Sequence, residues 1–407
     1  MFVRSLVCLF AISSAAAAAN VVVDAGPCAR RNCPVAIPLP PGHPLAKGAS
    51  GGAGVVLSAN GAKVPGAILP SGNGSELLLV LDGIAAGEKR AFEISAGGSP
   101  ARDAIALSAD GDRIKVSAGD RPLTAYDPAV KTMEKIWPVL HPLYGPAGAM
   151  LTRAFPLDGP PGDTKDHPHH QSVWTAHGDV NGINFWALKE GHGLVHQREC
   201  KQSCAPAAGR ISAALDWCDA SGKKVLEEQR TITFWATPET ARIIDFDATF
   251  RATEGDVKFG DTKEGGLLSV RLADSMREKQ TGNAPPGKII TSEGAIGEKD
   301  AWGKSAAWCD YSGPVGNATA GVTLLAHPEN SVHPMHWHVR AYGLMTANPF
   351  GLSEFAKDKT IDGSRTLKKG ESWRMRFRLI AHAGGADEAG LVGAYRDYAG
   401  PPSAELR

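Results

Sequence analysis

Short apolar runs separated by turn signals recur along almost the whole chain, and they constrain its fold more than any other feature. The longest runs are Ile211 to Trp217, Glu228 to Trp235, Ala241 to Phe250, Leu267 to Ala273, Val322 to Ala326 and Ser372 to Ala381. Many of them alternate polar and apolar side chains, as a strand with one buried face does. The 47 glycines and 28 prolines supply turns. Only residues 387–398 show helical spacing, so the sequence predicts an all-β protein.

The runs differ between two parts of the chain. Residues 20–127 contain short runs such as Leu77 to Leu81, and His43 is their only histidine. This part predicts a small N-terminal β-sandwich without an obvious chemical role. Residues 128–407 contain the longer runs and predict a large antiparallel β-sandwich.

The first nineteen residues resemble a secretory signal peptide. Arg4 provides a positive charge, an apolar stretch follows it, and the alanines up to Ala19 offer a cleavage site. No later stretch is long and apolar enough to cross a bilayer as a helix. We therefore expect a periplasmic or extracellular protein, cleaved near Ala19, without membrane insertion.

The charge balance argues against some classes of partner, and the number of cysteines suggests disulfides in an exported protein. Lys plus Arg and Asp plus Glu both number 43, so there is no basic excess for nucleic acid or anionic lipid. Six cysteines follow the signal peptide, and an even number in an exported protein favours disulfides. We expect the pairs Cys28–Cys33 and Cys200–Cys204, and by elimination Cys218–Cys309. The alternative is a zinc site built from the first four cysteines.

Eight of the thirteen histidines lie in two distant segments, one from Asp166 to His177 and one from His327 to Tyr342. Imidazole is the side chain best suited to proton transfer near neutral pH and is a common metal ligand. In a strand, residues two apart share a face, so His336, His338, Arg340 and Tyr342 should project together. Two such segments suggest one site that folding assembles.

Other polar residues complete a site suited to sugars, which need polar groups for their hydroxyls. We expect proton transfer by Glu264 with a histidine partner among His169, His170, His177 and His338. For substrate binding we expect Arg271, Arg340, Asn181, His336, Tyr342 and Asn348. Trp174, Trp186 and Trp337 are expected in the core rather than against a ligand.

Four motifs resemble the PmoA-like family of secreted bacterial proteins. They are His141 to Gly148, Asp166 to His170 with His177 to Gly182, Asp261 to Gly266, and His336 to Arg340 with Asn348 to Gly351. The resemblance covers much of the second region, and it implies a fold like the galactose-mutarotase supersandwich. Sites in such folds pair histidines with a carboxylate.

The favoured hypothesis is a secreted enzyme, a hydrolase, lyase or epimerase, that acts on a saccharide or other small polar substrate and needs no cofactor. One alternative is a metal-dependent oxygenase or hydrolase. Its divalent metal would be held by His336, His338 and a histidine of the first segment such as His170. Another alternative is a glycan-binding protein without catalysis.

Overall fold

The computed structural model describes residues 19–97, 103–128, 136–158, 162–238, 240–280, 282 and 284–407. Within these residues the chain forms four antiparallel sheets and a few short helices, which confirms the predicted all-β fold. The predicted signal peptide lies outside the described residues except for Ala19, where the first strand begins.

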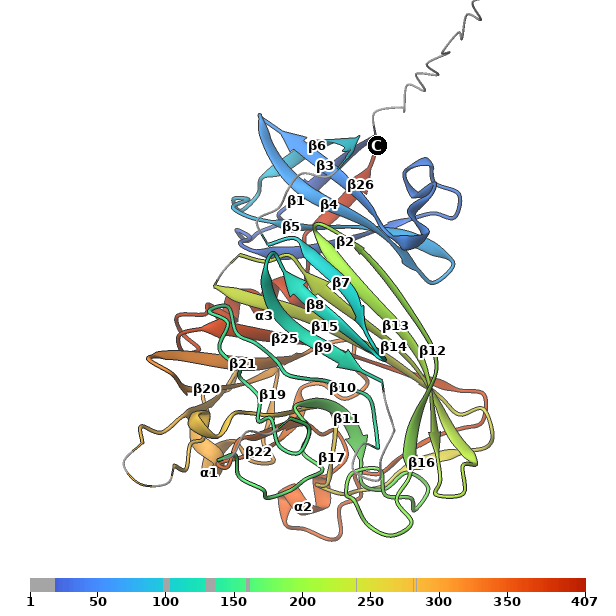
Figure 1. Cartoon of the computed structure of the whole chain (residues 1–407), viewed down its shortest axis with the longest axis vertical. Coiled ribbons are helices and arrows are strands. Elements are labelled where there is room, and N and C mark those ends of the chain that lie inside the picture. Colours follow the sequence, from blue (N-terminus) through green and yellow to red (C-terminus); the bar gives the residue numbers. More distant parts are fainter. Residues whose placement is uncertain are drawn as a thin grey trace, which may run out of the picture.

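The first sheet has its own hydrophobic core on one face and packs against the rest of the molecule with the other. Leu77, Leu79 and Leu81 of one strand lie in this core, whereas Leu78 faces Trp235 of a neighbouring sheet. In spatial order its strands are β2 (Cys33–Leu39), β5 (Gly74–Leu81), β4 (Ala62–Ser71), β3 (Ala53–Ala59), β6 (Lys89–Ala96), β1 (Ala19–Asp24) and β26 (Ser403–Leu406). Figure 1 shows this sheet at the top, with β26 beside β1.

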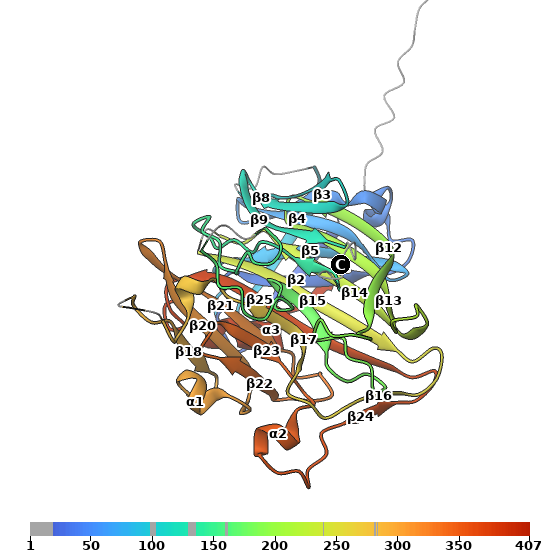
Figure 2. The same ribbon diagram turned by 60° about the horizontal axis from the view of Figure 1, so that its bottom comes forward.

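Two larger sheets form the rest of the molecule (Figures 1 and 2). The nine-stranded sheet has the order β19 (Ser305–Ala306), β22 (Met335–Arg340), β23 (Leu344–Ala347), β17 (Gly265–Arg271), β11 (Val173–His177), β10 (Val139–Leu140), β9 (Arg121–Asp127), β8 (Arg113–Ala118) and β7 (Ile105–Asp110). The eight-stranded sheet has the order β12 (Leu194–Ala205), β13 (Ala208–Cys218), β14 (Lys224–Trp235), β15 (Ala241–Arg251), β25 (Ser372–Ala383), β21 (Ala318–Ala326), β20 (Trp308–Val315) and β18 (Lys288–Thr291).

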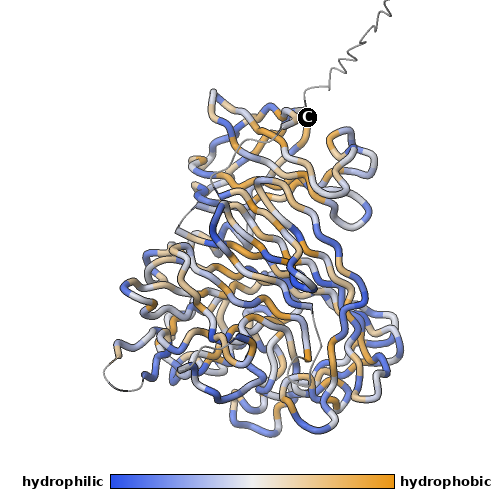
Figure 3. The backbone as a smooth tube through the Cα atoms, in the orientation of Figure 1, coloured by the Kyte–Doolittle hydropathy of each residue, from blue (hydrophilic) through white to orange (hydrophobic). Residues whose placement is uncertain are grey.

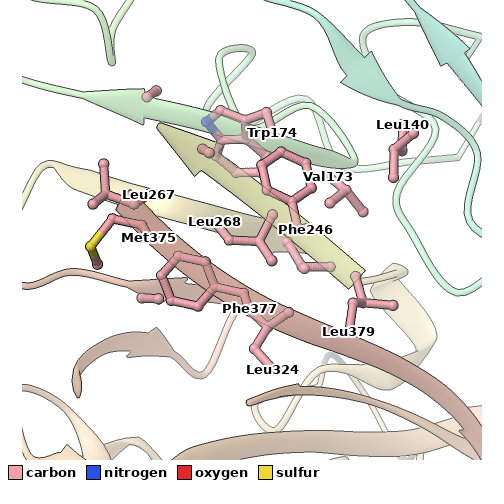
Figure 4. Packing of buried hydrophobic residues seen from close by; sticks show 14 of the residues in the cluster. Leu140, Val173, Trp174, Phe246, Leu267, Leu268, Leu324, Met375, Phe377 and Leu379 are labelled. Atoms are coloured by element: carbon pink, nitrogen blue, oxygen red, sulfur yellow. The ribbon is translucent and has the colours of Figure 1, made fainter. Parts of the chain in front are cut away.

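Side chains of both large sheets meet in the main core. Strand β25 contributes Met375, Phe377 and Leu379, which are two residues apart and therefore share a face. They lie near Trp174 of β11 and Leu268 of β17 (Figure 4). Arg378, on the opposite face of β25, instead pairs with Asp245 of β15 at 2.6 Å. Apolar segments accordingly follow the strands in Figure 3, while many connecting loops are hydrophilic.

The remaining elements are short. Strands β16 (Val257–Phe259) and β24 (Arg365–Leu367) form a two-stranded sheet. The α-helices are α1 (Gly297–Ala301), α2 (Leu352–Ala356) and α3 (Leu391–Ala399), and the 3-10 helices are η1 (Pro44–Ala46), η2 (Ala49–Gly51) and η3 (Asp274–Met276). Helix α3 corresponds to the helix expected within residues 387–398. The six long runs identified in the sequence all lie largely or wholly in strands.

Sheet membership changes earlier than the predicted boundary at residue 127. Strands β7, β8 and β9 belong to the nine-stranded sheet, so the change falls between β6 and β7. The C-terminal strand β26 also returns to the first sheet, where it pairs with β1. Composition does not reveal this boundary because the strands on both sides of it are short and similar.

The predicted disulfides are wrong, because all six cysteines among the described residues are free. Cys200 and Cys204 both lie on β12, and four residues of a strand span about 13 Å, too far for a disulfide. Cys218 on β13 and Cys309 on β20 have four strands between them. Cys33 begins β2 inside the first core, where burial raises the pKa of its thiol to about 12.

Among the described residues, none of the helices is both long enough and apolar enough to cross a membrane.

Candidate functional site

A cleft of about 620 Å³ lies where strand β22 meets the loops that precede β11 and β17. Four stretches of the sequence contribute to it, and three of them lie in or directly beside motifs singled out above, while residues 184–189 do not. The lining residues are His167, His169, His170, Asn184, Trp186, Ala187, Lys189, Lys263, Glu264, His338, Arg340 and Tyr342. A cavity of about 670 Å³ beside the first sheet has only Lys201 and Arg210 as titratable lining residues, and both are ion-paired.

Strand alternation places the second histidine segment. Met335, Trp337 and Val339 of β22 are fully buried in the main core. His338 and Arg340 therefore project from the opposite face toward the cleft, and Tyr342 follows just beyond the strand. This part of the site depends only on the period of the strand and on its apolar face.

The first histidine segment lies in a loop held by two arginines whose side chains are fully buried. Arg271 donates to both carboxylate oxygens of Asp166, at 2.9 Å each. Arg153 donates to the carbonyl oxygens of Asp166 at 2.7 Å and His167 at 2.9 Å. Burial alone would raise the pKa of Asp166, but the hydrogen bond from His167 and the charge of Arg271 hold it well below its usual range. Asp166 is therefore an anionic anchor for the loop.

Stacked rings run from the cleft wall into the core. His167 lies nearly parallel to Tyr342, with centroids 5.0 Å apart, and to His170, at 4.7 Å, and the His170 and Tyr342 rings are themselves 6.2 Å apart. His170 in turn stacks on the buried Trp174 at 5.6 Å. The guanidinium of Arg271 lies 4.8 Å from the centre of the Tyr342 ring. The stack fixes the planes of the cleft histidines and couples the loop to β22.

Burial keeps several cleft histidines uncharged at neutral pH. It lowers the pKa of His338 to about 3, assisted by the charge of Arg340. It lowers the pKa of His169 to about 4, assisted by the charges of Arg153 and Arg271. Burial also raises the pKa of Tyr342 to about 12. These side chains can donate and accept hydrogen bonds without adding charge to the cleft.

Glu264 lies on the loop before β17, where its neighbours hold it. Its carboxylate is 3.1 Å from the ammonium of Lys263, which also pairs with Glu354 at 3.2 Å. The Asn348 side chain donates to the carbonyl oxygen of Lys263 at 3.1 Å. At Gly265 a Cβ atom would lie 2.4 Å from the His177 ring, so only glycine fits beside that histidine.

Several residues expected in the site line the cleft, namely His169, His170, Glu264, His338, Arg340 and Tyr342. Arg271 and Asn348 lie behind its wall, where they hold Asp166 and the Lys263 loop. The others do not line it. His177 is fully buried against Phe350 and bonds to the carbonyl oxygen of Gly260 at 3.0 Å. The prediction that it joins the other histidines is therefore wrong.

His336 and Asn181 were also expected in the cleft and lie outside it. The ring of His336 stacks on Phe355, with centroids 6.1 Å apart. Asn181 adopts a positive φ of 55° and accepts a hydrogen bond from the Lys258 amide at 2.7 Å. The shared face of β22 begins to line the cleft only at His338, and Asn181 is a turn residue.

Sequence reasoning missed several lining residues, including His167, Asn184, Lys189 and Lys263. His167 and Lys263 are neighbours of predicted residues within the same motifs, so whole motifs were a better guide than selected positions. Trp186 belongs to the core, as expected, but it also forms part of the cleft wall.

The described residues contain no group of three or more His, Cys, Asp or Glu side chains placed to hold a metal ion. The alternative ligand set of His336, His338 and His170 is thus not assembled, because His336 lies outside the cleft. The alternative zinc site of Cys28, Cys33, Cys200 and Cys204 is not assembled either.

Residues 113–396 match a family described as a family of unknown function, DUF6807. This match corrects the expected resemblance to the PmoA-like family. The family found for residues 113–396 is DUF6807. No curated protein matches the chain. Among solved structures, galactose 1-epimerase from Lactobacillus acidophilus NCFM is similar with a TM-score of 0.32 and 9% identity, over 69% of this chain and 98% of the epimerase.

Proposed function

Because the chain belongs to the DUF6807 family, whose function is unknown, we propose from the cleft alone that it binds a saccharide and transfers protons on it. The observation that carries this proposal is that polar side chains from distant parts of the chain meet in one cleft that Trp186 and Tyr342 also line. Sugars present hydroxyls to polar side chains and C–H faces to aromatic rings.

His167 is the best-oriented base in the cleft. Its Nδ1 lies 2.6 Å from a carboxylate oxygen of Asp166, which is ionised and can only accept. Nδ1 must therefore carry the proton and donate it, so that Nε2 of the neutral ring is the atom with a free lone pair. Near-parallel contacts with Tyr342 and with His170 hold the plane of the ring. A carboxylate that orients an imidazole is the arrangement general-base catalysis requires.

Glu264 is the carboxyl partner in this proposal. It lines the same cleft from a different loop, and Lys263 holds it by an ion pair. Two titratable groups on separate loops can serve the two proton transfers that hydrolysis, elimination and epimerisation all need. His169 and His338, kept uncharged by burial, then serve as hydrogen-bonding groups for hydroxyls.

The proposal is tested by incubating the protein with a panel of neutral and acidic oligosaccharides and following the mixture by proton NMR, which detects cleavage, elimination and epimerisation alike. His167→Ala and Glu264→Gln should each lower turnover by about a hundredfold or more. His196→Gln, at an exposed position of β12, serves as the matched control and should be neutral.

The wild-type rate should show a bell-shaped pH dependence whose two limbs are altered separately by the two variants. If both variants fold and turn over substrate at the wild-type rate, His167 and Glu264 are not the acid–base pair. Failure of every oligosaccharide to bind or react would contradict the proposed function itself.

A further inference from the structure

Several side chains that line the cleft can offer only hydrogen-bond donors to a ligand. The Trp186 side chain is 1% exposed, and its Nε1 has no hydrogen-bond partner among the described residues. Indole nitrogen can only donate. Lys189, an exposed lining residue, makes no ion pair with another described residue. Lys189 therefore leaves its ammonium group for a ligand, and the indole N–H of Trp186 remains without an acceptor among these residues.

The amide and carboxylate acceptors of the cleft are already engaged. The amide oxygen of Asn184 already accepts from the backbone of Trp186 at 2.8 Å and of Ala187 at 2.7 Å. Its NH₂ group is what remains for a ligand. The carboxylate of Glu264 is engaged by Lys263 at 3.1 Å. A ligand that is itself rich in acceptors complements this wall better than a neutral sugar, whose hydroxyls donate as often as they accept.

The charged residues that line the cleft also favour a ligand that carries negative charge. Lys189, Lys263 and Arg340 line the cleft, against Glu264 as its only carboxylate lining residue among the described residues. Glu354 and Glu298 lie behind the wall and pair with Lys263 and Arg340. The uncharged state of His169 and His338 leaves the ammonium and guanidinium groups as the cations of the cleft.

We infer that the saccharide carries a carboxylate, so that the ligand class is an oligosaccharide of uronic acids. This inference rests on the proposed function and specifies its substrate. A carboxylate accepts charge-assisted hydrogen bonds at both oxygens, and the ammonium of Lys189, unpaired among the described residues, can donate them. It also acidifies the adjacent ring C–H, which gives the His167 base a proton to remove.

Calorimetric titration of the whole protein with matched oligosaccharides tests this inference. Each uronate oligomer of galacturonate, glucuronate or mannuronate is paired with its methyl ester and with the corresponding neutral oligomer. A neutral oligomer bearing sulfate esters forms a third arm. At least one free acid should bind about tenfold or more tightly than its ester, which is about 1.4 kcal/mol of binding free energy. The preference should weaken as salt is added.

Lys189→Met should remove most of the preference for the acid, because it should weaken binding of the acid more than binding of the methyl ester. Lys47→Met, at an exposed position remote in sequence from the cleft motifs, should retain the full preference. If esters or neutral oligomers bind as tightly as the acids, the inference that the ligand carries a carboxylate is wrong, and the proposed function still stands. Preferred binding of the sulfated oligomer would also overturn that inference. Absence of binding by all arms would instead contradict the proposed function.

Discussion

The two histidine-bearing segments reach the cleft by different physical means. On β22 a regular strand buries Met335, Trp337 and Val339 and so directs His338 toward the cleft. The loop at residues 166–170 has no such repeat, and buried arginines from other parts of the chain hold it instead. One half of the site is therefore encoded locally, and the other depends on long-range ion pairs.

This difference predicts a large gap in stability between two arginine variants. Arg153→Met removes the donor to several loop carbonyls and should lower the free energy of unfolding by about 3–5 kcal/mol, as breaking a buried charged network does. Arg340→Met breaks a partly exposed pair with Glu298 and should cost less than about 1 kcal/mol. Urea unfolding of both variants measures the gap. Equal losses would show that the loop is not anchored as described.

Acid should destabilise the protein, through both segments. The folded state keeps His338, His169 and the core residue His177 neutral down to pH values of about 3, 4 and 4. The unfolded chain takes up protons on these rings below about pH 6.5, so the free energy of unfolding falls as pH is lowered from 6.5 toward 4. Each fully buried ring contributes up to about 1.4 kcal/mol per pH unit, and this contribution to stability is fully present above pH 7.

Denaturant midpoints measured between pH 7.5 and 4.5 test this expectation. His338→Gln should flatten the pH dependence more than His169→Gln, because His338 on the strand is 3% exposed and His169 on the loop is only partly buried. His382 acts in the opposite direction, since its bond to Asp310 raises its pKa despite burial. The account fails on this point if the midpoint is constant over the range, or if both variants leave its slope unchanged.

The sequence predicted the strands well because their alternation is a local property. The ranges Ala241 to Phe250 and Ser372 to Ala381 fall within β15 and β25, and His338 and Arg340 reach the cleft as the strand period implied. His336, on the same face, does not reach it, and Tyr342 lines it from beyond the end of the strand. Predictions that needed distances across the fold were less successful. The residues around His177 in the sequence do not show that it packs on Phe350. Likewise, the sequence around Cys218 and Cys309 does not show that four strands lie between them.

The anchoring of the loop was equally hidden. Arg153 belongs to none of the motifs identified in the sequence. Its contacts with Asp166 and His167 form only when the chain folds. Arg271 was expected to bind substrate, since an arginine on the polar face of a strand suggests a ligand. In the structure its charge is used to hold Asp166. Sequence patterns indicated which segments form the site, and long-range packing determined which side chains face the ligand.

The central claim is that both segments contact one saccharide, and side-chain NMR of the histidines tests it directly. Acidic oligosaccharide is titrated into ¹⁵N-labelled protein while the imidazole signals are followed. The account predicts that the signals of His167, His169 and His338 shift with a common midpoint, whereas those of His177 and His336 stay in place. Shifts confined to one segment, or shifts at His177 as large as those at His167, would contradict a single site built from both.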